Sequence, residues 1–383
     1  MRRWWWVAWT VACIGIGILV GTLRLANMPQ GAEIGGIVLI AAVVLLAIGW
    51  WRDMRRARQR ARATGRRLKI VAIGGGTGLS VVLRGLKEFQ VDLTAVVTVA
   101  DDGGSSGRLR SDFAMPPPGD IRNCLVALAD TEPLLERLLQ YRFESGEGLA
   151  GHSFGNLFLA AMTHIMGDFE SAIRETSRVL AVRGRVLPAV KEDVRLQAVL
   201  SDGRVVEGES NIPLAGERIE RVQLIPEQLT PLPEVLSAIA EADAVIVGPG
   251  SLFTSVLPNL LIPEIVDAIR KSSATAMYIC NVMTQPGETD SLSASSHLET
   301  IYRHVGPGLF DYMLVNAAQF PEEALQKYQA QNAYPVQPDI EALHLLGVRV
   351  IARNFVHYAT YARHDSRLIA EQIVSLLGYE RTK

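Results

Sequence analysis

The strongest constraint on the fold is a pattern that occurs twice: an apolar stretch, a glycine-rich turn and a helical segment. It is present in residues 68–89, "LKIVAIGGGTGLSVVLRGLKEF", and in residues 242–261, "ADAVIVGPGSLFTSVLPNLL". Further apolar strands alternate with helical segments up to a closing helix near the C-terminus. Continuous apolar strands of this kind are typical of a parallel sheet covered by helices on both faces. We therefore predict an α/β fold with a mainly parallel sheet.

One segment departs from this pattern. Residues 194–210, "VRLQAVLSDGRVVEGES", alternate between apolar and polar side chains around Asp202 and Gly203. An Asp-Gly pair between alternating stretches is a β-hairpin signal. We therefore predict a small antiparallel insertion or edge.

The N-terminal region has a different composition. Residues 4–23 and 34–51 are almost wholly apolar, and each is close to the ~20 residues that a membrane-spanning helix needs. Tryptophans stand at the outer end of each run, as at a lipid–water interface. Arginines precede the first run, and residues 52–69 carry nine basic side chains and one acidic one. By the positive-inside rule, both ends of the hairpin face the cytoplasm.

We therefore predict a transmembrane helical hairpin over residues 1–51, an Arg-rich cytoplasmic linker over 52–68 and a main domain over 69–383. This places the protein at the inner (cytoplasmic) membrane with its main domain in the cytoplasm. The alternatives are a signal peptide and a buried core hairpin. A second span follows the first and no small-residue cleavage site is evident, which disfavours the signal peptide.

The composition excludes some classes of function. The net charge of −2 gives no indication of nucleic-acid binding. Cys13, Cys124 and Cys280 are far apart and have no histidine at ligand spacing, so neither a disulfide framework nor a zinc site is indicated.

The loops after the strands carry the candidate chemistry, because ligands of open α/β sheets bind outside the carboxyl ends of the strands. The turn Gly74–Gly78 combines closely spaced glycines with a helix N-terminus, which suits a phosphate. It is neither a GxGxxG dinucleotide motif nor a P-loop. A tight turn without a ligand is the alternative.

The stretch from Val96 to Asp112, "VVTVADDGGSSGRLRSD", follows a second strand. A carboxylate at Asp101 or Asp102 could accept hydrogen bonds from a ribose or base, or hold a hydrated Mg²⁺. Adjacent strand residues point in different directions, so we expect only one of them to reach a ligand. The following glycines and serines are expected to form an anion-binding nest, flanked by arginines. A solvated loop with a local Asp–Arg pair is the alternative.

Further loops supply hydroxyl, amide and guanidinium groups. Asp120 is a candidate N-cap of a helix that carries Arg122 and Asn123 in its first turn. His152 and Ser153 are neighbours in sequence, which does not make a nucleophile–base pair. A structural histidine and a capping role are the alternatives at these two loops. Near the C-terminus, Asp365 is a candidate helix cap.

The candidate ligand-binding residues share a place in these loops. They are Gly74, Gly75, Gly76, Thr77, Gly78, Asp101, Asp102, Ser105, Ser106, Arg108, Arg122, Asn123, Gly151, His152, Ser153, Asn156, Gly250, Ser251, Asn281 and Arg363. Asp101 and Asp102 are the candidates for a catalytic role. Spacing alone assigns no metal-ligand set, and no Ser/His/Asp triad stands out.

Seven motifs, in order, resemble one known family. They are "IGGGTGLS", "VTVADDGGSSGRLR", "PPPGDIRNCLVALA", "GHSFGNLFLAAM", "VGPGSLFTSVLPNLL", "CNVMTQPGET" and "RHDS". The chain from Lys69 to its C-terminus is similar to the YvcK-type gluconeogenesis factors, which are related to CofD, the 2-phospho-L-lactate transferase of coenzyme F420 synthesis. Most members of that family lack the predicted membrane hairpin.

The resemblance implies a Rossmann-like fold, binding of a UDP-sugar such as UDP-N-acetylglucosamine, and a role in cell shape and wall synthesis under gluconeogenic growth. It implies that Gly74–Gly78 faces the nucleotide phosphates, that Asp101 and Asp102 lie near an acceptor substrate, and that Arg363 contacts the UDP-sugar. Ser366 falls where some relatives carry a phosphorylatable threonine. The expected partners are the ligand, the membrane through residues 4–51, cell-wall synthesis proteins and further copies of the chain.

Three classes of function remain to be compared. A non-catalytic UDP-sugar-binding regulator is favoured, because the resemblance supplies no reaction. A Mg²⁺-dependent, CofD-like transferase acting on a phosphorylated or nucleotide-linked substrate is the alternative. A NAD-dependent dehydrogenase is disfavoured, because Asp101 lies 27 residues after Gly74, beyond the ~20 expected for a ribose-binding acid.

Overall fold

A computed structural model describes residues 66–358 and 362–378. The chain divides into two units, Met1–Arg66 and Arg67–Lys383, and the described residues belong almost entirely to the second. The predicted membrane hairpin, with spans at 4–23 and 34–51, and the linker up to residue 65 lie outside the described residues. Within the described ranges, no single helix combines the length and apolarity needed to span a bilayer, although the bent pair Leu252–Leu260 and Pro263–Lys271 does so when taken together.

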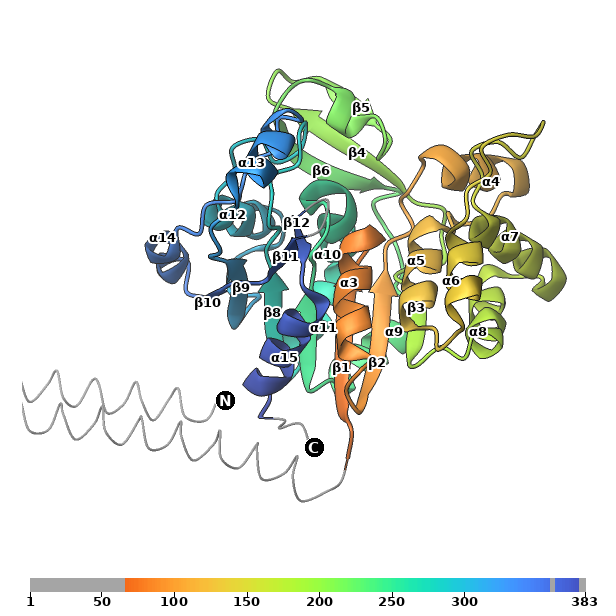
Figure 1. Cartoon of the computed structure of the whole chain (residues 1–383), viewed down its shortest axis with the longest axis horizontal. Coiled ribbons are helices and arrows are strands. Elements are labelled where there is room, and N and C mark those ends of the chain that lie inside the picture. Colours follow the sequence, from red (N-terminus) through yellow and green to blue (C-terminus); the bar gives the residue numbers. More distant parts are fainter. Residues whose placement is uncertain (1–65, 359–361, 379–383) are drawn as a thin grey trace, which may run out of the picture. The chain divides into compact units, whose positions relative to one another are not determined.

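A seven-stranded sheet forms the centre of the domain, in the order β10-β9-β8-β7-β1-β2-β3 (Figure 1). Every neighbouring pair in it is parallel, which confirms the predicted α/β fold. The strands are β1 (Leu68–Gly74), β2 (Val91–Val97), β3 (Arg185–Pro188), β7 (Ala244–Val247), β8 (Thr275–Ile279), β9 (Tyr312–Asn316) and β10 (Arg349–Arg353).

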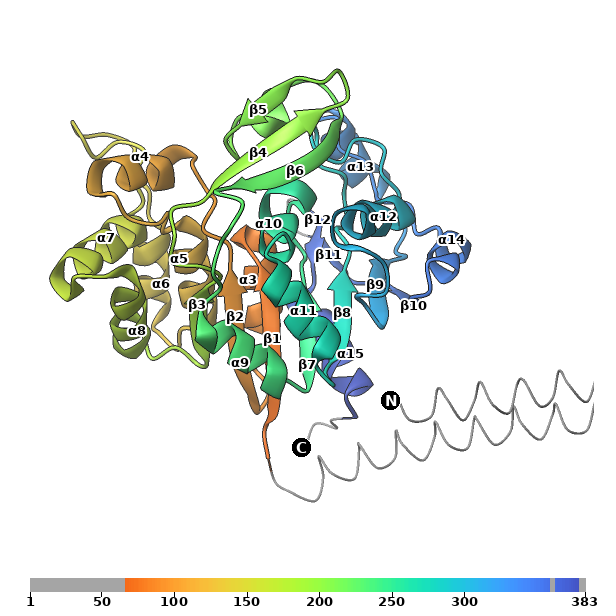
Figure 2. The same ribbon diagram turned by 180° about the vertical axis from the view of Figure 1, so that it is seen from behind.

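Helices cover both faces of this sheet. On one face, α3 (Gly76–Leu86) packs between α5 (Gly119–Leu128) and α15 (Ser366–Leu376), as Figure 1 shows. On the other face, α9 (Pro233–Glu241) packs against α11 (Pro263–Lys271), as Figure 2 shows. The apolar strands are covered accordingly: all four residues of β7 and the last five of β1 are buried.

The connections carry the remaining helices. Between β2 and β3 the chain forms α4 (Gly104–Phe113), α5, α6 (Pro133–Gln140), α7 (Phe154–Met166) and α8 (Phe169–Val179). After β7 come a short π-helical turn, η2 (Leu252–Val256), and α10 (Leu257–Leu260). The later connections contain α12 (Ala294–Val305), α13 (Glu322–Gln329) and α14 (Ile340–Leu345).

The predicted antiparallel insertion is confirmed. Strands β4 (Arg195–Leu200), β5 (Val205–Glu207) and β6 (Ile219–Ile225) form a three-stranded sheet in the order β5-β4-β6. Asp202 and Gly203 lie in the turn between β4 and β5, and both strand pairs are antiparallel. A second small pair, β11 (Val356–Tyr358) and β12 (Ala362–His364), precedes α15.

The strand order places a switch point between β1 and β7. From β1 the chain proceeds to β2 and β3 on one side, and from β7 it proceeds to β8, β9 and β10 on the other. Loops at the carboxyl ends of these two central strands therefore diverge, which is where open α/β sheets bind ligands. Both glycine turns of the sequence pattern lie there.

Candidate functional site

The two glycine turns lie against each other at the switch point. A side chain on Gly78 would collide with the carbonyl of Pro249, so this close approach of two backbones requires a glycine. The buried Asn259 amide donates to the carbonyls of Gly74, at 3.1 Å, and Ser255, at 2.9 Å. One side chain thus joins the end of β1 to the helical turn that follows β7.

The loop after β8 fixes the second glycine turn. The Gly250 N–H donates to Asn281 Oδ1 at 3.1 Å, and Asn281 Nδ2 donates to the Gly250 carbonyl at 2.8 Å. The Ser251 hydroxyl donates to Gln285 Oε1 at 2.6 Å. The predicted residues Gly250, Ser251 and Asn281 are therefore neighbours in space, although their loops are far apart in sequence.

Glu288 extends this contact into the interior. Its side chain is 5% exposed and accepts hydrogen bonds from the Thr254 hydroxyl, the Gln285 amide and the Phe253 N–H. Burial raises the pKa of Glu288 to about 7, although these hydrogen bonds act to lower it.

Asp101 and Asp102 point in different directions, as predicted. Asp101 Oδ1 accepts from the Gly103 N–H at 2.9 Å, and its Oδ2 lies so close to Gly119 that a side chain there would meet it at 2.8 Å. Asp102 Oδ1 accepts from the Ser210 N–H in the antiparallel insertion, also at 2.9 Å. Asp101 is thus directed toward the start of α5, and Asp102 toward the insertion.

Asp101 belongs to a cluster of acids with Asp120 and Glu209. Burial, and then the charge of Asp101, raise the pKa of Asp120 to about 7, opposed by hydrogen bonding from the Gly76 N–H and by Arg122. Burial and the charges of Asp101 and Asp120 raise the pKa of Glu209 far above its ordinary range. Glu209 is therefore protonated at neutral pH and can donate its proton in a hydrogen bond to Asp101.

Asp120 is not the N-cap that the sequence predicts. Helix α5 begins at Gly119 with Pro118 in the cap position. Asp120 lies in the first helical turn and accepts instead from the N–H of Gly76 in the first glycine turn. The residue thus links the start of α5 to the start of α3.

The predicted anion-binding nest is the first turn of helix α4 instead. Ser105 and Ser106 are each 3% exposed. The Ser105 hydroxyl lies 3.0 Å from His152 Nδ1 and accepts from Asn156 Nδ2 at 3.1 Å. These contacts join α4 to α7, so the four buried side chains, Ser105, Ser106, His152 and Asn156, support one another. Burial, and then Arg108, lower the pKa of His152, which keeps it neutral.

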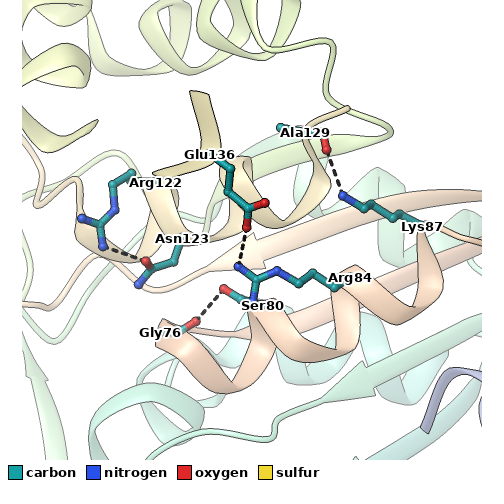
Figure 3. A network of polar contacts seen from close by, with 8 residues as sticks. All are labelled: Gly76, Ser80, Arg84, Lys87, Arg122, Asn123, Ala129 and Glu136. Atoms are coloured by element: carbon teal, nitrogen blue, oxygen red, sulfur yellow. Dashed lines mark hydrogen bonds and ion pairs between the residues drawn. The ribbon is translucent and has the colours of Figure 1, made fainter. Parts of the chain in front are cut away.

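The arginines of these loops have protein partners. Arg108 donates to the carbonyl of Ala150 at 2.8 Å, next to Gly151. Arg110 forms an ion pair with Asp193 at 2.6 Å. Arg122 donates to the Ser153 hydroxyl at 2.6 Å and to Asn123 Oδ1 at 2.7 Å, the latter drawn in Figure 3.

Two buried atoms near Ser153 are unsatisfied. Within the described residues, neither Arg122 Nε nor Asn156 Oδ1 has a hydrogen-bond partner. The Arg122 side chain donates to the Ser153 hydroxyl, and the same hydroxyl accepts from the backbone N–H of Asn156 and so caps α7. One donor and one acceptor in these loops are therefore left without a partner among the described residues.

Arg363 is an exposed residue of β12, and the next residue, His364, contacts the carboxyl edge of the main sheet. His364 Nε2 donates to the carbonyl of Cys280 at the end of β8, at 3.0 Å. Burial lowers the pKa of His364 to about 4, so the ring is neutral. Asp365 accepts from the N–H groups of Arg367 and Leu368, which confirms the predicted cap of α15. Ser366 is the first residue of that helix.

Sequence reasoning missed Glu209 of the acid cluster, assigned Asp120 only a capping role and did not predict the burial of Glu288. Glu209 comes from the insertion, and the only sequence signal for it was the Gly208-Glu209-Ser210 turn after the hairpin.

In the described part of the chain, no three His, Cys, Asp or Glu side chains are arranged to hold a metal ion. Mg²⁺ commonly takes only one or two carboxylates, with water and substrate phosphates completing its shell. Asp101 could supply one such carboxylate.

A cavity of about 710 Å³ lies elsewhere, at the amino ends of β1, β2 and β3. It contains none of the glycine turns or clustered acids. We place the candidate site at the carboxyl edge, because the switch point and the interacting polar groups are there.

Comparison with known proteins shows the family. The family model of CofD, 2-phospho-L-lactate transferase, matches residues 70–356. The gluconeogenesis factor of Bacillus subtilis is 55% identical over 82% of this chain and 99% of its own length. That of Halalkalibacterium halodurans is 54% identical over 82% of this chain and 97% of its own.

A solved structure agrees. The crystal structure of a UPF0052-family protein from Bacillus halodurans is 53% identical, with a TM-score of 0.79, and covers 81% of this chain and 99% of that one. A relative from Nostoc is 48% identical over 92% of this chain and 81% of its own length, so that match extends into the first 65 residues. The chain belongs to the CofD family and, within it, to the gluconeogenesis factors.

Proposed function

We propose that this protein is a UDP-sugar-binding regulator, tethered to the cytoplasmic membrane, that supports cell shape and wall synthesis under gluconeogenic growth. UDP-N-acetylglucosamine is the proposed ligand, and the carboxyl edge of the sheet is the proposed site. The name of the Bacillus relatives supports the link to gluconeogenesis. The two apolar runs at 4–23 and 34–51 motivate the tether.

The observation that carries the ligand proposal is the pair of glycine turns at the switch point. Gly74–Gly78 and Gly248–Ser251 meet backbone to backbone, which leaves peptide groups, rather than bulky side chains, to face a pyrophosphate. Beside them, Arg122 and Asn156 each have one buried atom without a partner in the described residues. A sugar or ribose hydroxyl could satisfy both atoms.

Calorimetry of the fragment 66–383 tests the ligand proposal. We expect a heat of binding with UDP-N-acetylglucosamine, and a loss of affinity in Arg122→Lys, which keeps the charge but has no Nε donor. Arg178→Lys on the exposed face of α8 is the matched control. A silent titration with the sugar nucleotide at millimolar concentration would eliminate the proposal.

The membrane tether has its own test. The full chain is expected to sediment with membranes and to resist extraction by alkaline carbonate, whereas any membrane-bound fragment 66–383 is expected to be released into the supernatant by the same treatment. Release of the full chain by carbonate would show that the apolar runs do not span the bilayer. A deletion strain should lose its normal shape only on gluconeogenic carbon sources.

The second candidate function is a Mg²⁺-dependent, CofD-like phosphotransferase. The specific observation in its favour is the acid cluster, since Asp120 has its pKa raised to about 7 and lies beside Asp101. A carboxyl group with such a pKa can accept a proton from an attacking hydroxyl at neutral pH. When bound, Mg²⁺ would neutralise the phosphate charge.

Turnover of a nucleotide-linked or phosphorylated substrate would separate the two candidates. A transferase predicts product formation that depends on added Mg²⁺ and falls by at least about a hundredfold in Asp120→Asn. Binding without product in the unmodified protein would favour the regulator. Equal turnover in Asp120→Asn would remove Asp120 from the proposed chemistry.

A further inference from the structure

The cavity at the amino edge of the sheet is separate from the proposed ligand site. Its walls come from the starts of β1, β2 and β3, from the end of α3 and from α9. In a parallel sheet the amino and carboxyl ends of the strands lie at opposite edges. Figure 3 shows the same separation along α3: Gly76 lies at one end of the helix and Lys87 follows the other.

The lining of this cavity is basic. Five cationic side chains, Arg67, Lys69, Lys87, Arg183 and Arg185, face two acidic ones, Asp92 and Glu241. Lys69 is paired with Glu241, and Arg183 is paired with Asp130 at 2.7 Å. The remaining three cations therefore exceed the one remaining carboxylate.

The three remaining cations are not neutralised by a carboxylate. Lys87 donates to the carbonyl of Ala129 at 2.9 Å (Figure 3), and Arg185 donates to the Thr94 hydroxyl at 3.0 Å. Both partners are uncharged. Within residues 66–358 and 362–378, Arg67, Lys87 and Arg185 form no ion pair with a carboxylate. An anionic group entering the cavity would therefore meet a lining with an excess of positive charge.

We propose that this cavity binds the phosphate-bearing headgroup of an anionic phospholipid. Covalent continuity favours a lipid as the source of the phosphate. Arg67 follows directly on the Arg-rich run that begins at residue 52, which itself follows the apolar run 34–51. A basic cavity at the point where such a run enters the folded domain adds to the same electrostatic attraction to anionic lipid. The proposed lipid binding rests on the proposed membrane attachment and names a site in the folded domain that would contribute to it.

The test uses the fragment 66–383, which lacks both apolar runs, so its outcome does not depend on the hairpin. Relatives that consist of this domain alone, including one solved by crystallography, show that the domain folds without a preceding segment. Flotation with vesicles containing phosphatidylglycerol is compared with flotation on pure phosphatidylcholine. We expect salt-sensitive binding to the anionic vesicles only.

Charge variants then locate the binding. Arg67→Gln/Arg185→Gln should weaken vesicle binding about thirtyfold, since each basic residue near the surface contributes roughly a factor of five. Arg67→Gln alone should weaken it about fivefold, and it alters an exposed side chain that the fold does not require. The matched control is Arg270→Gln/Lys271→Gln, which removes two charges from the end of α11, at the same edge of the sheet but outside the cavity.

Three outcomes overturn the proposal. The first is equal binding to both kinds of vesicle. The second is an equal loss in the control pair, which would assign the effect to the whole edge and not to the cavity. The third is saturable binding of glycerol phosphate in solution without any vesicle binding, which would identify a soluble anion as the occupant. UDP-N-acetylglucosamine binding, measured on the same variants, should be unchanged and separates this site from the carboxyl edge.

Discussion

The carboxylate of Asp102 accepts a hydrogen bond from the N–H of Ser210 at 2.9 Å and so joins the parallel sheet to the antiparallel insertion. A side chain on Gly208, in the same turn, would meet the Asp102 Oδ2 at 2.5 Å. Asp102 is therefore placed to hold the insertion over the end of β2. This position brings Glu209, which lies between those two residues, to Asp101.

The first prediction concerns the hydrogen bond between Asp102 and the Ser210 N–H. Asp102→Ala removes the acceptor of the Ser210 N–H, so we expect a loss of about 1 kcal/mol of stability. Hydrogen exchange of the turn 208–211 should accelerate, while the strands of the main sheet keep their protection. Asp92→Ala, at an exposed aspartate of β2, is the control for the loss of charge. Unchanged exchange in the turn would contradict the role of Asp102.

The second prediction concerns Asp101. Its negative charge is the largest cause, after burial, of the raised pKa of Asp120. Asp101→Asn should therefore lower the pKa of Asp120 from about 7 toward the ordinary range of a carboxyl group. Carboxyl-carbon NMR titration measures this shift directly.

Asp102→Asn is the matched control for that titration. Asp102 follows Asp101 in the chain but turns toward the insertion, and its charge is not among the main causes of the raised pKa of Asp120. A titration of Asp120 that moves equally in both variants would show that the two aspartates do not differ as their geometry indicates.

The sequence predicted the parts of the fold that depend on local pattern. Continuous apolar strands required a sheet buried on both faces, and Asp202-Gly203 required a hairpin turn. The buried sheet and the hairpin turn both follow from the order of apolar and polar residues within short segments of the chain. The cap at Asp365 was predictable for the same reason, since its partners are the next few N–H groups.

The acid cluster could not be predicted in this way. Asp102 and Ser210 are 108 positions apart, so no local pattern brings Glu209 to Asp101. The glycine- and serine-rich stretch after Asp102 has a low helix propensity and was expected to form a loop. Burial of Ser105 and Ser106 against His152 and Asn156 overrides that preference and completes the first turn of α4.

The third prediction follows from that burial. Asn156→Leu keeps the volume of the side chain but removes the donor to Ser105, so stability should fall by about 1 kcal/mol in a urea titration. The cause is the loss of one hydrogen bond to a buried hydroxyl, which keeps its contacts with His152 Nδ1 and the Ser153 N–H. Thr163→Val, which removes a helix-internal hydroxyl on the same helix, should cost less. Equal losses would show that the α4–α7 contacts add little.

The fourth prediction is a dependence of stability on pH through Glu288. The pKa of this carboxyl rises from 4.5 to about 7 on folding, so the folded state binds more protons between these values and stability is lost as the pH rises through them. Glu288→Gln mimics the protonated acid. Relative to the unmodified protein, it should gain on the order of 2–3 kcal/mol between pH 4.5 and pH 8.

Thermal unfolding of both proteins at pH 4.5 and pH 8 tests whether Glu288→Gln gains stability relative to the unmodified protein as the pH rises. The change should be specific to position 288, so Glu264→Gln, at the exposed start of α11, should show no such gain. A constant difference between Glu288→Gln and the unmodified protein at both pH values would mean that the buried carboxyl is not protonated on folding.

The last prediction separates contact with the ligand from the support of that contact. Arg363 is exposed, so Arg363→Ala should leave stability unchanged and weaken the binding of UDP-N-acetylglucosamine by about tenfold to a hundredfold, the value of one charge-assisted contact. His364→Phe removes the donor to the Cys280 carbonyl that anchors β12 to the end of β8. It should therefore weaken binding and also lower stability by about 1 kcal/mol.

Calorimetry and thermal unfolding of both variants give the comparison, with Arg353→Ala, an exposed arginine at the end of β10, as the control. A loss of affinity in the Arg353 control as large as in Arg363→Ala would show that the edge contributes only diffuse positive charge, whereas a loss confined to Arg363 and His364 would place the ligand beside β12.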